Sequence, residues 1–178
     1  MSRFKIAATL LLLVFSAPAC KRFAGDRRNQ PATSNNANES RRVASADVVK
    51  ASPQEVDIPR GGSAETIVHL SIQNGYHVNA NPPSYPYLKA TALDLPSVAG
   101  ISAAFVSYPN PITRKFSFAE KPLAVYEGST NLKVLLKANN SAHPGKQNFS
   151  GKLHVQACDD QVCYPPGELE VTIPVTIK

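Results

Sequence analysis

The stretch L-E-V-T-I-P-V-T-I-K, residues 169–178, has an apolar side chain at every second position. These apolar positions are the odd-numbered ones: Leu169, Val171, Ile173, Val175 and Ile177. Because successive side chains of a β-strand point to opposite faces, this period of two is typical of a strand with one buried face. We therefore predict a strand whose odd-numbered residues face a core.

The same alternation recurs upstream. Residues 68–72, 132–136 and 153–157 each have apolar side chains at alternate positions, and a further strand fits Ile101 to Tyr108. Turn-forming residues separate these windows, and no window keeps a helical period over three turns. The turn signals are Arg60-Gly61-Gly62, Asn74-Gly75, Asn81-Pro82-Pro83, Pro109-Asn110-Pro111, Glu127-Gly128 and Pro144-Gly145. Seven to nine short strands in roughly 130 residues predict an all-β fold, an antiparallel sandwich of immunoglobulin-like type.

The beginning of the chain has the pattern of an export signal. Two basic residues precede an apolar run at 6–15, and Ala17-Pro18-Ala19 then offers small residues for cleavage. We interpret residues 1–19 as a signal peptide. The next residue, Cys20, makes the site similar to a bacterial lipobox, in which the cysteine is lipidated. Ala17 stands where a lipobox usually has Leu, so a plain secreted protein or an uncleaved signal anchor is the alternative.

The net charge of +6 lies outside the predicted domain. The signal peptide contributes two positive charges, and residues 20–45 contribute six basic and two acidic side chains. Residues 46–178 have equal numbers of each sign, so the charge gives no reason to expect nucleic-acid binding. With almost no apolar side chains to bury, residues 20–46 are predicted to be a flexible tether, followed by one domain at 47–178.

Two of the three cysteines lie in one short segment, A-C-D-D-Q-V-C-Y-P-P at residues 157–166. Because predicted strands precede and follow this segment, we expect a hairpin with Cys158 and Cys163 on the two sides of its tip. Directly opposed residues of an antiparallel pair lie about 4.5–5.5 Å apart, within the reach of a disulfide. Export to an oxidising compartment favours formation of the bond.

The spacing alone leaves the purpose of this disulfide open. For a closed loop of six residues, chain entropy predicts roughly 2 kcal/mol of stabilisation, near the low end for disulfides. An exposed disulfide at a loop tip belongs to the labile kind. Asp159 and Asp160 place negative charge beside the sulfurs, which raises a thiol pKa. The spacing is therefore compatible with two functions of the disulfide, a redox-active pair and a structural bridge.

Other polar residues offer weaker signals. His154 and Cys158 are four strand residues apart, about 13 Å, which is too far for both to bind one zinc ion. We therefore expect no metal and no cofactor. His77 has no nucleophile in a recognisable setting beside it, so we interpret it as a histidine in a turn rather than a catalytic base.

Four segments, in the same order, carry a resemblance to a known family. The last and most specific is Q-A-C-D-D-Q-V-C-Y-P-P at 156–166, and the other three lie upstream. They are N-G-Y-H-V-N-A-N-P-P at 74–83, Y-P-N-P at 108–111 and V-Y-E-G at 125–128. Together they resemble the N-terminal periplasmic domain of the thiol:disulfide interchange protein DsbD, over about residues 47–178.

The resemblance implies an immunoglobulin-like domain that relays electrons. In that family the domain takes reducing equivalents from a thioredoxin-like domain and passes them to periplasmic partner proteins. By motif position, Cys163 would be the attacking thiol and Cys158 the resolving thiol. In the family, a cap loop shields the disulfide. The matching stretch here offers Phe118 or Phe116 as the shielding residue, and burial in the core is the alternative role for either side chain.

The chain as given ends at Lys178, whereas full-length DsbD continues into a membrane domain and a thioredoxin domain. We therefore expect a separate DsbD-like membrane electron donor, thioredoxin-like redox partners, and a lipid anchor at Cys20 on the periplasmic side of a bacterial membrane. The alternative function is an immunoglobulin-like binding module of a lipoprotein, with a purely structural disulfide.

Overall fold

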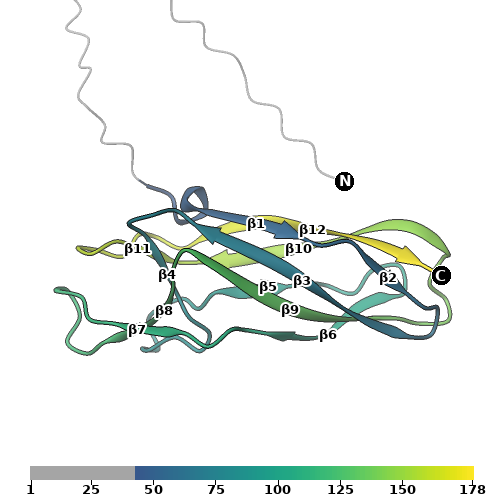
Figure 1. The fold of residues 1–178 in the computed structure, drawn as a ribbon, viewed down its shortest axis with the longest axis horizontal. Coiled ribbons are helices and arrows are strands. Elements are labelled where there is room, and N and C mark those ends of the chain that lie inside the picture. Colours follow the sequence, from purple (N-terminus) through teal and green to yellow (C-terminus); the bar gives the residue numbers. More distant parts are fainter. Residues whose placement is uncertain (1–42) are drawn as a thin grey trace, which may run out of the picture. The chain divides into compact units, whose positions relative to one another are not determined.

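The computed structural model describes residues 43–178 (Figure 1). The predicted signal peptide, Cys20 and the tether up to residue 42 lie outside the described residues. The described part contains twelve strands and one short 3-10 helix, η1 (Ser45–Val48). It contains no helix long and apolar enough to cross a membrane.

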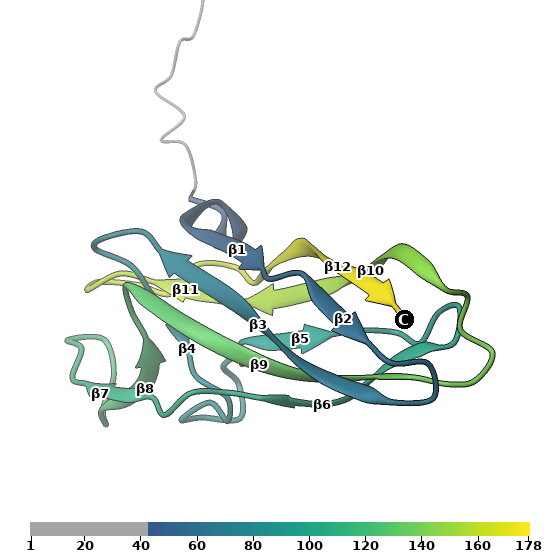
Figure 2. The same ribbon diagram turned by 45° about the vertical axis from the view of Figure 1, so that its right-hand side comes forward.

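Two four-stranded sheets form the body of the domain. Their strands cross one another in Figure 2. The first sheet has the order β1-β3-β9-β6, and the second has the order β2-β12-β10-β5. The first consists of β1 (Val49–Pro53), β3 (Ser63–Ile72), β9 (Ser129–Ala138) and β6 (Ile101–Ser107). The second consists of β2 (Val56–Ile58), β12 (Gly167–Ile177), β10 (Gly145–Val155) and β5 (Ala92–Asp94).

The core lies between these two sheets. One cluster of buried side chains joins the inward-facing residues of β3 and β9 to those of β10 and β12. Its fully buried members include Leu70, Leu132, Phe149 and Ile173. Burial of this alternating apolar set is the main stabilising contribution, because each fully buried Leu, Ile or Phe contributes about 1.5–3 kcal/mol.

The strands predicted from alternation are confirmed, except that residues 153–157 are divided between β10 and β11, because Gln156 lies outside both strands. Residues 169–177 of the quoted stretch lie in β12, which pairs antiparallel with β10 over its whole length. Four of its five apolar positions are buried, and Leu169 is half-buried at the start of the pattern. The all-β, immunoglobulin-like prediction is also confirmed. The described residues form twelve strands rather than seven to nine, and one pair, β2 and β12, runs parallel instead of antiparallel.

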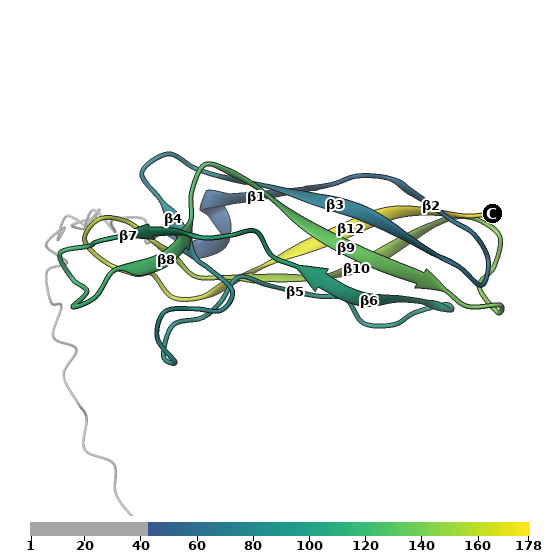
Figure 3. The same cartoon turned by 60° about the horizontal axis from the view of Figure 1, so that its bottom comes forward.

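A third sheet lies at the end of the domain opposite the C-terminus (Figures 1 and 3). Its order is β11-β4-β8-β7, and its strands are two to four residues long. They are β11 (Ala157–Cys158), β4 (His77–Asn79), β8 (Leu123–Tyr126) and β7 (Ile112–Arg114).

This third sheet has two buried faces. Val78, Tyr126 and Ala157 face the main core. Because side chains alternate along a strand, their neighbours His77, Val125 and Cys158 face the other way. On that side lies a second, smaller apolar cluster of Leu88, Phe116, Leu123 and Val125, with Cys163 packed against it. The cysteine pair is therefore built into the outer face of a sheet that is otherwise anchored in the core.

Candidate functional site

Cys158 and Cys163 form a disulfide, with their Cα atoms 3.9 Å apart. The two residues face each other in a single antiparallel bridge, as the predicted hairpin requires. The strand that contains Cys158 also pairs on its other side with β4, where Cys158 lies opposite His77. Cys158 is fully buried, whereas Cys163 is partly exposed. A thiol or disulfide from outside can therefore approach Cys163 more readily than Cys158.

The loop between the cysteines is organised by Asp159. Its Oδ1 accepts hydrogen bonds from the backbone N–H groups of Gln161 and Val162, both at 2.8 Å. Its Oδ2 accepts a hydrogen bond from the Tyr164 hydroxyl at 2.5 Å. This last bond is the main cause that lowers the pKa of Asp159, and it raises the pKa of Tyr164 to about 12. The acidic side chain thus fixes the shape of the loop that presents Cys163.

Ser45 holds together the two segments on either side of the disulfide. Its hydroxyl donates to the Pro165 carbonyl at 2.6 Å and accepts from the Ala157 N–H at 2.9 Å. Ser45 is 1% exposed, so neither bond competes with water. This residue comes from the end of the segment predicted as a tether, and nothing in the local sequence pattern indicates its role.

Gln156 forms a second connection. Its Oε1 accepts from Asn79 Nδ2 at 3.1 Å and from the Lys89 N–H at 2.8 Å, while its Nε2 donates to the Tyr164 carbonyl at 3.2 Å. One side chain therefore ties β4, the loop that carries Lys89, and the segment after Cys163 to one another. The disulfide is consequently supported on a rigid base, although it lies at the end of the domain.

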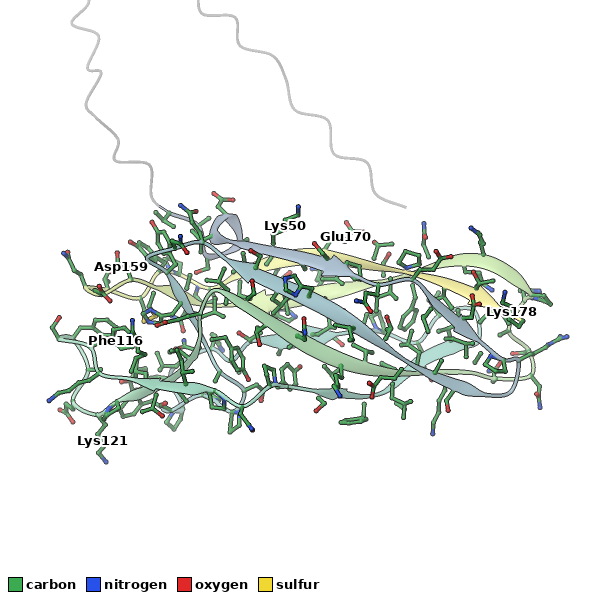
Figure 4. All side chains as sticks on the ribbon, viewed as in Figure 1. Lys50, Phe116, Lys121, Asp159, Glu170 and Lys178 are labelled. Carbon is green, nitrogen blue, oxygen red and sulfur yellow. A yellow bond between two sulfur atoms is a disulfide. The ribbon has the colours of Figure 1, made fainter. Side chains whose placement is uncertain are left out.

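The loop between β7 and β8, residues 115–122, covers this site. Figure 4 shows Phe116 and Asp159 at the same end of the domain. Phe116 is 4% exposed and belongs to the apolar cluster against which Cys163 packs. Phe118 stacks on Phe116 with ring centroids 5.4 Å apart, yet it is 39% exposed. The Ser117 hydroxyl donates to the Asp160 carbonyl at 3.3 Å, which joins this covering loop directly to the disulfide loop.

His77 differs from its sequence interpretation, because it lies in strand β4 rather than in a turn. Its side chain is 2% exposed and stacks on the Phe116 ring at 4.1 Å between centroids. Burial lowers its pKa from 6.5, against the raising influence of the nearby Glu127 and Asp160 carboxylates. The glycine in G-Y-H suggested a turn, but Gly75 ends the turn and the strand begins two residues later.

The structure brings together all but one of the predicted site residues. Cys158, Cys163, Phe116 and Phe118 meet at one end of the domain, while Cys20 lies outside the described residues. Sequence reasoning did not find Ser45 or Gln156, and it placed His77 in a turn rather than in strand β4. Within residues 43–178, no group of three or more His, Cys, Asp or Glu side chains is arranged to hold a metal ion.

Fold and site together define an immunoglobulin-like domain that presents a partly covered disulfide at one end. Residues 45–174 match the family described as "Thiol:disulfide interchange protein DsbD, N-terminal". The chain therefore belongs to the DsbD N-terminal domain family. No curated protein sequence matches the chain.

The solved structures that are similar to this chain include two N-terminal domains of bacterial proteins. The N-terminal periplasmic domain of ScsB from Proteus mirabilis has a TM-score of 0.48 and 15% identity, over 70% of this chain. The DsbD N-terminal domain of Neisseria meningitidis, in its reduced form, has a TM-score of 0.44 and 15% identity, over 75% of this chain. The match spans 44% of the ScsB chain and 90% of the Neisseria chain.

Proposed function

We propose that this protein performs thiol–disulfide interchange with partner proteins through Cys158 and Cys163. In the reduced protein, the Cys163 thiolate attacks a partner disulfide and forms a mixed disulfide, releasing one partner thiolate. Cys158 then attacks Cys163, the intramolecular disulfide forms again, and the second partner thiolate leaves. The partner gains two electrons and the cysteine pair loses two. A thioredoxin-like donor returns the pair to its reduced form.

The difference in burial between the two cysteines is the observation that supports this order of events. Cys158 has no exposed surface, whereas Cys163 is partly exposed on the loop that Asp159 shapes. A partner disulfide has to approach the attacking sulfur in line, so the exposed residue is the one that can form the mixed disulfide. Cys158 needs only to reach Cys163, its directly bridged neighbour.

The covering loop supports a gated exchange. Phe116 and Phe118, the two candidates for a shield, stack on each other above the disulfide end of the domain. The hydrogen bond that joins this loop to the disulfide loop, from Ser117 to Asp160, lies at an exposed position. Displacement of the loop by a partner would uncover Cys163, and its return would protect the pair from other thiols.

The surface around the site favours a protein partner. Large apolar side chains are exposed on the disulfide loop, the covering loop and the strand and loop beside them: Val162, Phe118, Ile112 and Tyr87. Exposed apolar and aromatic side chains of this kind are typical of protein interaction sites. A thioredoxin-like protein is the partner class that we propose on both sides of the reaction.

The proposal extends to the position of the protein in the cell. The family and the periplasmic domain of ScsB support an exported protein on the periplasmic side of a bacterial membrane. We propose that Cys20 is the lipid attachment site and that a DsbD-like membrane protein supplies the electrons. A lipid anchor would keep the domain near such a donor and raise its effective concentration.

A trapping experiment tests the roles of the two cysteines. Full-length Cys158→Ala and Cys163→Ala variants, each also carrying Cys20→Ser, are mixed with a thioredoxin variant that keeps only its attacking cysteine, activated as a mixed disulfide with thionitrobenzoate. The products are separated without reductant and identified by mass. Cys158→Ala should accumulate a mixed disulfide through Cys163, because the resolving thiol is missing. Cys163→Ala should give little adduct, because Cys158 is buried.

The matched variants also separate the alternatives. If neither variant forms an adduct, the disulfide is structural and the domain is a binding module, as the second interpretation of the sequence holds. If Cys163→Ala forms the adduct as readily as Cys158→Ala, the assigned order of attack is wrong.

A further inference from the structure

His77 lies against the disulfide on the outer face of the third sheet. It is the direct antiparallel partner of Cys158, and such paired side chains have Cβ atoms about 4.5–5.5 Å apart on the same face. Phe116 stacks on the imidazole, and His77 is almost completely buried. The imidazole is therefore in contact with the cover of the site and belongs to the residue paired with the buried cysteine.

The Nε2 atom of His77 has no hydrogen-bond partner. In the described part of the chain, His77 Nε2 and Asn79 Oδ1 are the two buried side-chain polar atoms without a hydrogen-bond partner. A buried polar group left unpaired costs about 1–3 kcal/mol, so it calls for an explanation. In the disulfide form the neighbouring sulfur carries no proton. Reduction changes this, because it creates a thiol on Cys158, the residue directly paired with His77.

The charges around His77 come from the strands and loops packed against it. Glu127 follows β8, Arg114 ends β7, and Asp159 and Asp160 lie in the disulfide loop. The carboxylates favour the charged imidazole, while Arg114 and burial oppose it, and burial is the largest influence. The net lowering of the pKa keeps His77 neutral at neutral pH, with one nitrogen free to accept a proton.

We propose that His77 is the proton acceptor for the resolving cysteine, Cys158. This inference rests on the proposed exchange at the Cys158–Cys163 pair. It explains how a fully buried thiol next to an acidic loop becomes a nucleophile, since only the thiolate attacks a disulfide. Burial and neighbouring carboxylates would otherwise keep the Cys158 proton in place.

The step balances as follows. In the mixed disulfide, the Cys158 Sγ–H bond breaks and its proton passes to His77 Nε2. The Cys158 sulfur forms a bond with Cys163 Sγ as the bond from Cys163 to the partner sulfur breaks. The partner sulfur leaves with the electron pair of that bond as a thiolate. The imidazolium then gives its proton to this thiolate or to water, and His77 is neutral again.

Ellman's reagent separates the two sulfur steps in a stopped-flow experiment. The full-length protein with Cys20→Ser is reduced, freed of reductant and mixed with an excess of the reagent. Attack by Cys163 releases one coloured thiolate, and attack by Cys158 on the adduct releases the second. The rates of both phases are measured between mildly acidic and mildly alkaline pH. The test variant is His77→Phe, which keeps an aromatic ring against Phe116. The control is His69→Phe on β3, whose histidine is partly exposed and belongs to the first sheet.

We expect His77→Phe to slow the second phase about 100-fold at neutral pH, the lower range of general acid–base catalysis. Its rate should then rise steadily with pH as the Cys158 thiol ionises. The unsubstituted protein should instead reach a plateau at a pH near or below 6.5, the usual pKa of histidine. The first phase should be the same in both proteins, and His69→Phe should change neither phase.

An unchanged second phase in His77→Phe, with the same pH profile, overturns the inference and leaves the proposed exchange intact. Absence of the first phase in the unsubstituted protein contradicts the proposed function itself. If His77→Phe fails to fold, His77→Gln replaces it, because an amide fills a similar volume but takes no proton at neutral pH. A plateau that persists in His77→Gln would likewise overturn the inference.

Discussion

Replacement of Phe116 by Ala should open the covered disulfide to attack. Phe116 is 4% exposed, stacks on both His77 and Phe118, and belongs to the apolar cluster that contacts Cys163. The loop that carries it is held to the disulfide loop by the Ser117–Asp160 hydrogen bond. If the loop has to move before a thiol reaches the Cys163 sulfur, Phe116 determines how much free energy the movement requires.

The contacts of Phe116 set the expected size of the effect. Burial of a Phe side chain contributes about 1.5–3 kcal/mol, and an aromatic pair adds about 0.5–1.5 kcal/mol. The loss of about 3 kcal/mol on substitution corresponds to a population of the open loop about 100-fold larger, since 1.36 kcal/mol is a factor of ten. Phe118 is already 39% exposed, so Phe118→Ala should lose about 1 kcal/mol, or a factor of about five.

The rate of disulfide reduction measures this effect. The oxidised protein is treated with excess dithiothreitol, samples are quenched with an alkylating agent, and the reduced fraction is read by mass. Phe105→Ala on β6 is the control, because Phe105 is 55% exposed and belongs to the first sheet. We expect the rate of reduction to be highest for Phe116→Ala and intermediate for Phe118→Ala. The control and the unsubstituted protein should share the lowest rate. A Phe116→Ala rate equal to that of the control would refute the shielding argument.

Two further predictions concern the loop and its support. The hydrogen bond from the Tyr164 hydroxyl is the main cause that lowers the pKa of Asp159 below 3.8. The ionised Asp159 therefore stabilises the folded protein above about pH 3.8, and this stabilisation is lost as the pH falls through the lowered pKa of the folded state. Asp159→Asn should therefore bring the pKa of Tyr164 from about 12 back toward 10.0, as followed by the ultraviolet absorbance of the phenolate. Ser45→Ala should lower the free energy of unfolding in urea by about 1–3 kcal/mol, because it leaves a buried Ala157 N–H without a partner; an unchanged midpoint would show that water replaces the hydroxyl.

Much of the fold could be predicted because alternation is a local signal. The apolar positions at 68–72, 132–136 and 169–178 identify strands without knowledge of their partners, and these strands carry most of the core. Pairing is different, because it depends on residues far apart in the chain. The parallel contact between β2 and β12 joins residues more than a hundred positions apart, and no local pattern indicates it.

The site shows the same division. Cys158 and Cys163 could be found from their spacing, because the loop between them is short and its hydrogen bonds are local. Ser45 and Gln156 act through partners at long range, so their roles are visible only in the folded chain. The interpretation of His77 as a turn residue is wrong, because its pairing with Cys158 far along the chain places it in a buried strand.

The reduction potential of the Cys158–Cys163 pair is the most direct test of the proposed interchange. It is measured by equilibrating the full-length protein carrying Cys20→Ser with thioredoxin and with glutathione at several ratios of oxidised to reduced forms. We predict a reduction potential above about −300 mV, because an exchanging pair has to be reducible by its donor. We also predict that the pair exchanges faster with thioredoxin than with glutathione. A potential well below about −300 mV, together with no exchange with thioredoxin, would contradict the proposed function and assign the disulfide a structural role.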